Sequence, residues 1–280
     1  MRIRSSNPLI LTALVVPLLG ACDAPAYVTS PAFSDAPSFD RFTLDLPENP
    51  VFMSAAEAAA DPNPWFPLVP GAEWTYEAET EDGLETTVDV VTGDTELIGS
   101  IEATVVRDEV YLENDLIELT FDWYAQDTEG NVWYLGEASC EWEPGDFSGD
   151  VSEIEDEGDC EDAGGDPAGS WQAGLDGAEA GIIMWADPLA HKGKAYRQEY
   201  YKDEAEDMAK VLRGALEVTV PAGAFTDCIE TMDWTPLEPG AREHKFYCAG
   251  YGMVLEVQPQ GGRVRNELVD YEELPVDPGS

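Results

Sequence analysis

Thirteen Asp and Glu residues and no basic residue lie between residues 137 and 170. Clustered carboxylates of this kind can supply the several oxygen ligands that Ca²⁺ takes. A calcium-loop register that starts at Asp159 fails, because it places Ala163 and Ser170 at positions that must provide ligands. The sequence therefore favours a solvated acidic loop and leaves weak Ca²⁺ binding open. The weak candidate ligands are Asp156, Asp159, Glu161 and Asp162.

Cys228, His244 and Cys248 have side chains of the types that bind zinc. If His244 and Cys248 share a strand, four residues at about 3.3 Å each place them about 13 Å apart. That separation is too long for one ion whose ligand bonds are about 2 Å long. We therefore favour a disulfide between the two cysteines, with a histidine nearby.

Signatures of hydrolases and nucleotide-binding proteins are absent from the sequence. It contains no Gly-x-Ser-x-Gly, no His-Glu-x-x-His, no Walker A loop and no dinucleotide fingerprint. A pair of Asp or Glu side chains can hydrolyse a substrate without a linear motif, but 58 acidic residues make their spacing uninformative. We therefore expect a protein that is not an enzyme, and a hydrolase that uses an Asp/Glu pair is an alternative.

The first twenty-two residues have the order of a secretory leader. Arg2 and Arg4 precede an apolar stretch, residues 9–19, that is too short to span a bilayer, and the leader ends at Leu19-Gly20-Ala21-Cys22. In this segment the chain resembles the bacterial lipoproteins. The resemblance implies that residues 1–21 are a signal peptide and that Cys22 carries acyl chains. Such a protein is anchored to a membrane of the bacterial cell envelope and faces the periplasm or the cell surface.

Four further cysteines indicate disulfides, because an even number is typical of exported proteins. Three pairings are open from the sequence, and we favour the pairing of sequence neighbours. Cys140 and Cys160 bracket the acidic loop, and a bridge between them would restrict an otherwise floppy segment. Cys228 and Cys248 lie in two candidate strands that a turn can bring side by side.

The composition excludes one class of partner. The formal net charge is −44, and it becomes −46 when the leader is removed with its two arginines. Nucleic-acid binding depends on cationic groups that neutralise phosphates, so we exclude nucleic acid as a partner. Hydrophobic residues make up 44% of the chain, which is enough for a folded core. The acidity fits a saline habitat, where counterions screen repulsion, or a role in binding cations.

Alternation of apolar and polar residues predicts antiparallel strands from Trp65 onward. In the clearest strand, residues 116–124, Leu119 and Phe121 share one face, which we expect to be core, and Asp122 lies on the other. The predicted fold class is mainly β, a curved antiparallel sheet or open β-barrel with little helix. Residues 203–213 are compatible with a helix or with a continuation of the sheet. The other predicted strands are 73–79, 84–92, 101–112, 131–135, 216–220, 243–248, 253–257 and 263–269.

Residues 22–62 are predicted to form a lipid-anchored flexible tether, because they are rich in Pro, Ala and Ser. A short helix is expected at residues 54–60, where Ser54 and Glu57 have capping-box spacing. The remaining boundaries follow from the strand pattern. We expect one antiparallel β domain over residues 63–272, with residues 137–170 as an acidic loop insertion, and a tail over residues 273–280.

A second resemblance depends on three segments, residues 63–76 (NPWFPLVPGAEWTY), 220–225 (VPAGAF) and 249–254 (AGYGMV). In these segments the chain resembles an uncharacterised group of β-rich bacterial envelope lipoproteins. The resemblance implies a curved antiparallel sheet or open barrel and carries over no catalytic residue. The segments also have a structural reason, because Pro and Gly residues at these places suit turns between strands.

Aromatic side chains are candidates for a binding cavity, since a curved sheet can enclose an acyl chain or another apolar molecule. Aromatic residues of a β domain more often belong to its core. The candidates are Trp65, Phe66, Trp74, Tyr76, Phe121, Trp123, Trp133, Tyr196, Tyr200, Tyr201, Phe246 and Tyr251.

The sequence as a whole predicts a membrane-anchored envelope lipoprotein with a non-catalytic binding or structural role. Its expected partners are the membrane, through the lipid on Cys22, and either an apolar small molecule or an envelope protein. No cofactor is expected apart from the alternative of Ca²⁺. The alternative functions are a Ca²⁺-binding surface protein and the hydrolase that uses an Asp/Glu pair.

Overall fold

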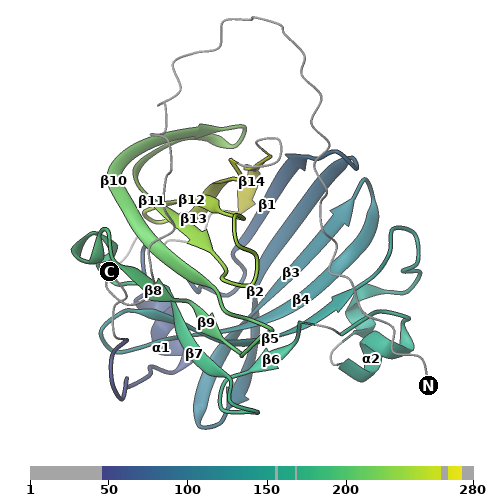
Figure 1. The fold of residues 1–280 in the computed structure, drawn as a ribbon, viewed down its shortest axis with the longest axis horizontal. Helices are drawn as coiled ribbons and strands as arrows, with labels where there is room; N and C mark the ends of the chain where they lie inside the picture. Colours follow the sequence, from purple (N-terminus) through teal and green to yellow (C-terminus); the bar gives the residue numbers. More distant parts are fainter. Residues whose placement is uncertain (1–45, 155–156, 168, 260–263, 273–280) are drawn as a thin grey trace, which may run out of the picture.

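The computed structural model describes residues 46–154, 157–167, 169–259 and 264–272. This part of the chain forms one antiparallel sheet of 14 strands, which is curved and not closed, together with two short α-helices (Figure 1). The predicted fold class is therefore confirmed. The signal peptide, Cys22 and the tail lie outside the described residues.

The strands follow one another along the chain mostly as neighbours in the sheet, whose order is β8-β10-β11-β12-β13-β14-β1-β2-β3-β4-β5-β7-β9, with β6 beside β5. The first five are β1 Glu73–Glu79, β2 Leu84–Ile98, β3 Ile101–Leu112, β4 Asp115–Gln126 and β5 Val132–Glu141. Four short strands come next, β6 Trp171–Gln172, β7 Glu179–Met184, β8 Ala195–Arg197 and β9 Glu199–Tyr200. The last five are β10 Met208–Val220, β11 Gly223–Trp234, β12 Glu243–Cys248, β13 Gly252–Val257 and β14 Arg265–Glu272.

The two ends of the sheet meet at one short stretch, residues 195–200, which we call the closing segment. Its first half, β8, pairs with β10, and its second half, β9, pairs with β7. In Figure 1, β10 arches over one side of the molecule, β2 to β4 form the opposite side, and β7 to β9 lie between them. Gly181 of β7 permits this approach, because a Cβ there would lie 2.4 Å from the carbonyl carbon of Gln198.

The curvature gives the sheet an inner face that encloses the main core. Residues paired across neighbouring strands project from the same face. Val91, Val106 and Tyr124, on β2 to β4, belong to the same buried cluster as Ile229 and Tyr247, on β11 and β12. These strands are far apart in the sheet order, so their side chains meet across the hollow that the sheet surrounds.

The apolar face of β4 is core, as predicted, but it lies on the outer side of the sheet. Leu119 pairs with Cys140 there, in a satellite cluster that also contains Ile154 and Cys160. The polar face of the same strand, with Thr120 and Asp122, is buried as well. Both faces of β4 are therefore enclosed, although only the apolar face was predicted to be core.

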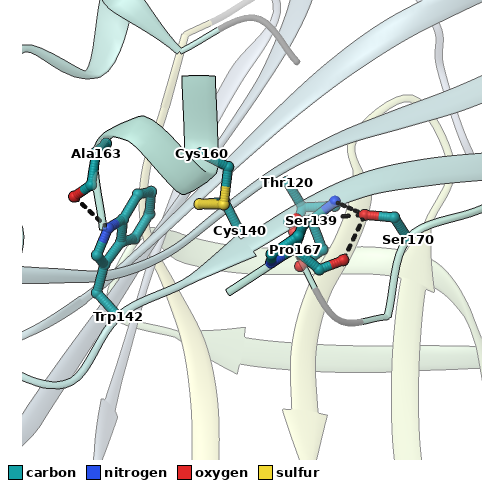
Figure 2. Close-up of a disulfide and its surroundings, with 8 residues drawn as sticks. All are labelled: Thr120, Ser139, Cys140, Trp142, Cys160, Ala163, Pro167 and Ser170. Atoms are coloured by element: carbon teal, nitrogen blue, oxygen red, sulfur yellow. Dashed lines mark hydrogen bonds between the residues drawn. A yellow bond between two sulfur atoms is a disulfide. The ribbon is translucent and has the colours of Figure 1, made fainter. Parts of the chain in front are cut away.

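The acidic segment, residues 142–170, covers this outer face. The predicted insertion began at residue 137, which is wrong, because residues 137–141 belong to β5. The segment contains the 3₁₀ turn Val151–Glu153 and the helix α2, Glu157–Asp162, and a disulfide joins Cys160 to Cys140 of β5 (Figure 2). The described part of the segment is therefore packed and covalently fastened, since its Trp142 indole also donates a hydrogen bond to the carbonyl of Ala163 at 3.3 Å.

Residues 46–62, which the sequence assigned to the flexible tether, pack against the sheet instead. The Met53 amide donates to the carbonyl of Gln126 at 2.9 Å, and Phe52 forms an isolated bridge with Asp127. The predicted helix is present as α1, Ala55–Ala60, and Ser54 and Glu57 form the expected capping box. Low periodicity concealed this packing, because it combines backbone hydrogen bonds with single apolar side chains such as Phe52, which packs against Trp133.

Candidate functional site

Four carboxylates form a row across the inner face of the sheet. Asp89 on β2 is paired with Asp108 on β3, and Asp122 on β4 is paired with Glu137 on β5. Val106 lies two residues before Asp108 on the same face of β3, and it is paired with Asp122 on β4. The two pairs of carboxylates are therefore neighbours on one face of the sheet. The sequence analysis named none of these four acids as candidates.

Tyr134 joins two members of the row. Its hydroxyl group lies 2.5 Å from Oδ1 of Asp122 and 2.7 Å from Oε2 of Glu137. Burial raises the pKa of Asp122 to about 7, against the effect of the hydrogen bond with Tyr134. Burial and the charge of Asp122 raise the pKa of Glu137 to about 8. These two side chains therefore hold protons at pH values where exposed carboxylates are ionised.

Asp89 and Asp108 form a second coupled pair. Burial raises the pKa of Asp89 to about 6, and a hydrogen bond with Asp108 opposes the rise. Burial and then the charge of Asp89 raise the pKa of Asp108 well above its ordinary value. The two carboxyl groups thus share one proton near neutral pH, because the second ionisation would place two negative charges side by side.

Lys245 is a basic group of the inner face, on β12 across the hollow from the row. Its ammonium nitrogen lies 3.4 Å from Glu243, 3.9 Å from Glu256 and 3.9 Å from Asp233. Burial lowers the pKa of Lys245, but the three carboxylates outweigh it and hold the pKa well above its ordinary value. Carboxyl groups outnumber this cation among the described residues of the inner face, so the hollow favours cations over anions.

A cavity of about 60 Å³ lies on the inner face beside Asp89. Its walls are almost entirely apolar, and Asp89 supplies the charged group of its lining. Seven of the lining residues belong to two of the three segments that carry the family resemblance, residues 63–76 and 249–254. The lining residues are Phe66, Pro67, Leu68, Trp74, Tyr76, Asp89, Val91, Val106, Gly252 and Met253.

Backbone contacts fix these two segments against each other. The Gly250 amide donates to the carbonyl of Pro64 at 2.7 Å, and the Trp74 indole donates to the carbonyl of Tyr251 at 2.7 Å. Asn63 is buried and its Oδ1 accepts the amide of Trp65 at 2.8 Å. The aromatic walls of the cavity are therefore held in place before any ligand arrives.

The predicted candidates for cation binding do not form a built site in the described part of the chain. Asp159, Glu161 and Asp162 lie on or at the end of α2, with Glu161 and Asp162 exposed, and Asp156 lies outside the described residues. No three His, Cys, Asp or Glu side chains among the described residues are arranged to hold a metal ion. Weak binding of Ca²⁺ to the acidic segment stays a prediction.

The cysteines pair as sequence neighbours, Cys140 with Cys160 and Cys228 with Cys248. The second bridge joins residues that are directly opposite on β11 and β12. A zinc site with His244 is therefore unsupported, because both cysteine ligands are used. His244 instead lies 2.7 Å, through Nδ1, from a carboxylate oxygen of Glu230.

The aromatic candidates separate into groups. Phe66, Trp74 and Tyr76 line the cavity. Trp133 and Tyr196 belong to a second buried cluster, while Trp65 and Tyr201 pack against the main one. Phe246 and Tyr251 pack in a third cluster, Phe121 and Trp123 pack at the outer side, and Arg197 stacks over the ring of Tyr200 at 4.0 Å. Most of the list is core, and three members face the cavity.

These features define an antiparallel β protein whose curved sheet surrounds a carboxylate-rich inner face and a small apolar cavity. Among the described residues, no helix has the length and apolar composition needed to cross a membrane. No family model and no curated protein matches the chain.

Two solved structures are similar to the chain. A candidate lipoprotein from Parabacteroides distasonis has a TM-score of 0.34 and 12% identity, over 74% of this chain and 98% of its own. A candidate exported protein with a YmcC-like fold from Bacteroides fragilis has a TM-score of 0.39 and 15% identity, also over 74% and 98%. Likeness at this level is partial, and it assigns no function to the chain.

Proposed function

We propose that this protein is a lipoprotein of the bacterial cell envelope, anchored through Cys22, that binds a small ligand at the inner face of its sheet without catalysing a reaction. The leader supports export and anchoring, and the two disulfides fit an oxidising compartment. The observation that carries the binding role is the preformed apolar cavity beside the half-buried carboxylate of Asp89.

Anchoring is tested by expressing the full chain with its leader in a Gram-negative host. The intact mass of the membrane-bound product should correspond to an acylated chain that begins at Cys22. The Cys22→Ser variant should lose the acyl mass and leave the membrane fraction. An unprocessed leader, or a soluble product with a free thiol at Cys22, would contradict the anchoring.

Binding is tested by filling the cavity. Val91 is buried in the cavity wall, so Val91→Met should occupy the space, raise the melting temperature of the free protein and abolish ligand binding. Val105→Met is a matched control, because Val105 is paired with Trp123 and lies on the opposite face of the sheet. Native mass spectrometry of protein isolated from its own host should detect a small ligand on the wild type and the control only. No ligand on the wild type, or one that survives in Val91→Met, counts against the proposal.

A second candidate function is a hydrolase, and the Asp89–Asp108 pair is the observation that favours it. One ionised and one protonated carboxyl group side by side can act as general base and general acid on a bound water and its substrate. Turnover of chromogenic glycosides or esters that is lost in both Asp89→Asn and Asp108→Asn would establish this activity. The binding role predicts no turnover above that of buffer.

A further inference from the structure

Four Lys and Arg side chains have no acidic partner among the described residues, although the sequence contains 58 acidic residues and 14 basic ones. They are Lys192, Lys194, Lys210 and Arg242. Every other described Lys or Arg side chain lies within 4.0 Å of a carboxylate oxygen. Cations that stay unpaired in so acidic a protein can attract an anionic partner from outside the chain.

The pairing of the strands places three of these cations near one another. Lys210 of β10 is opposite Ala195 of β8, so Lys194 is next to its partner in the ladder. On its other side Lys210 is opposite Met232 of β11, whose own partner on β12 lies two residues after Arg242. Burial, and then the charge of Arg242, lower the pKa of Lys210, as expected for cations that are neighbours.

Two exposed leucines lie in the turns beside the cations. Leu189, in the 3₁₀ turn Pro188–His191, is 43% exposed, and Lys192 follows this turn directly. Leu237 is 41% exposed in the loop between β11 and β12, and Arg242 is the last residue of that loop. Together the four cations and these two leucines form what we call the cationic face. Aliphatic side chains next to Lys and Arg suit the surface of a bilayer, where the cations meet head groups.

The cationic face and the acidic segment lie on opposite sides of the molecule. In Figure 1, β8 and β10 are on the left, and α2 of the acidic segment is on the right. The first described residues, drawn in purple, are also on the left, and Leu46 packs against the cluster that contains Tyr196 and Val211. An anchor at Cys22 therefore does not have to reach round the molecule for the cationic face to touch the membrane.

The negative charge of the whole protein does not prevent this face from approaching an anionic bilayer. Charges are screened over about 8 Å at physiological ionic strength, so acids elsewhere on the surface interact weakly with a bilayer that touches this face. The two exposed acids of its turns, Asp187 and Glu238, are outnumbered by the four cations. Each Lys or Arg close to an anionic bilayer strengthens binding about fivefold, whereas acidic surfaces are repelled.

We propose that the cationic face lies against the anionic phospholipid head groups of the membrane that holds the anchor. The four cations contact lipid phosphates, and Leu189 and Leu237 reach the level of the head groups. The proposal rests on the anchoring proposed above and adds the orientation of the anchored domain. Because Lys194 directly precedes the closing segment, the place where the two ends of the sheet meet lies beside the bilayer in this orientation.

The experiment couples the mature chain, which begins at Cys22, to vesicles. The four other cysteines form the two disulfides, so Cys22 offers a single thiol to a maleimide lipid. One set of vesicles contains only phosphatidylcholine, and the other contains about 30% phosphatidylglycerol as the anionic lipid. Acetylation with a water-soluble reagent, followed by mass spectrometry, measures how far the bilayer covers each lysine. Acetylation of Lys192, Lys194 and Lys210 should be at least about threefold slower on the anionic vesicles, and about 0.5 M NaCl should abolish the difference.

Lysine variants identify the charges that are responsible. Replacing Lys192 and Lys194 together by Gln removes two exposed cations without partners, so the melting temperature should not change. Docking on the anionic vesicles should weaken at least about tenfold, and Lys210 should lose most of its protection. The matched control replaces Lys202 and Arg265 by Gln, since each of these already pairs with an acid, and it should leave Lys210 protected.

Several results would overturn the proposal. Equal acetylation of the three lysines on both kinds of vesicle would refute the docking and leave the anchoring standing, because anchoring is measured separately by the mass of the native product. Protection that survives high salt, or the double Lys192 and Lys194 variant, would refute the role of these charges. Protection that appears on neutral vesicles and grows with the density of protein would show that a second copy of the chain covers this face instead.

Discussion

Replacing Asp122 by Asn should stabilise the protein, and more strongly at alkaline than at acidic pH. Asp122 is a buried member of the inner row, and its pKa is raised from 3.8 to about 7. Its contribution to stability is complete below pH 4 and is lost as the pH rises towards 7, because the unfolded chain releases the proton earlier than the native state does. Asn keeps the shape and an acceptor for the Tyr134 hydroxyl, and it has no proton to lose.

The magnitude follows from the difference between the two pKa values. The wild type loses about 2 kcal/mol at pH 5 and about 4 kcal/mol at pH 8 through this one group. The gain from Asp122→Asn should therefore be about 2 kcal/mol larger at pH 8 than at pH 5. Relief of the repulsion on Glu137 acts in the same direction.

Urea unfolding at pH 5 and pH 8, at equal ionic strength and with the disulfides intact, measures this difference. Urea is preferred to guanidinium because it adds no ions that screen charges. Asp115→Asn is the control, since it removes an equal charge from the exposed start of the same strand and should change the unfolding free energy by less than about 0.5 kcal/mol. A gain that is equal at both pH values, or smaller at pH 8, would refute the account of the buried row.

Three further changes test other parts of the structure. Gly181→Ala should lower the unfolding free energy in urea by at least about 2 kcal/mol, because its Cβ would lie 2.4 Å from the backbone of Gln198. Gly93→Ala is the control, since its Cβ enters open space and the change should cost less than about 1 kcal/mol. Equal losses in the two variants would contradict the close approach. Replacing Cys140 and Cys160 together by Ser should cost about 3 kcal/mol for a separation of 20 residues and direct limited proteolysis first to the acidic segment, and an unchanged digest would count against this. If the acidic segment binds Ca²⁺, then Ca²⁺ should protect it from proteolysis and raise the melting temperature far more than Na⁺ does at matched ionic strength; equal shifts would show screening alone.

Several strands could be placed from the sequence with their observed bounds. Residues 73–79, 101–112 and 243–248 are β1, β3 and β12 as predicted. In these stretches apolar and polar residues alternate, and clear turn signals lie at both ends. Each strand pairs with a strand close to it in sequence or in the sheet order, so the local pattern is enough to place it. The sequence left the first half of β10 ambiguous between helix and strand. It is a strand in the structure because it pairs along its length with β11, a contact that the local sequence does not show.

The enclosed acids could not be predicted from alternation alone. Glu118, Thr120 and Asp122 have the pattern of a solvated face, and the curling of the whole sheet encloses them instead. That curling depends on the closing segment, whose two strands are too short to show a period. The residues of a single strand also do not show which other strands it pairs with.

One local signal for the cavity was present in the sequence. Asp89 and Val91 are two residues apart in β2, so their side chains project from the same face of the strand. An acidic residue therefore lies on the same face as Val91, which is almost fully buried. A charged side chain in such a position is either paired or functional. The segments 63–76 and 249–254 suggested turns and core, and only their contact in space shows that they form two walls of one cavity.

The closing segment joins the two ends of the sheet around the hollow through few backbone pairs. Three register pairs join it to β10 and two join it to β7, and the other boundaries around the hollow are held by longer ladders, apart from the β5–β7 and β13–β14 pairings, which also have three pairs each. Releasing residues 195–200 would part the two edges of the sheet and leave the long hairpins on either side intact. The inner carboxylates would then be open to a bulkier molecule than the sheet admits with this segment in place.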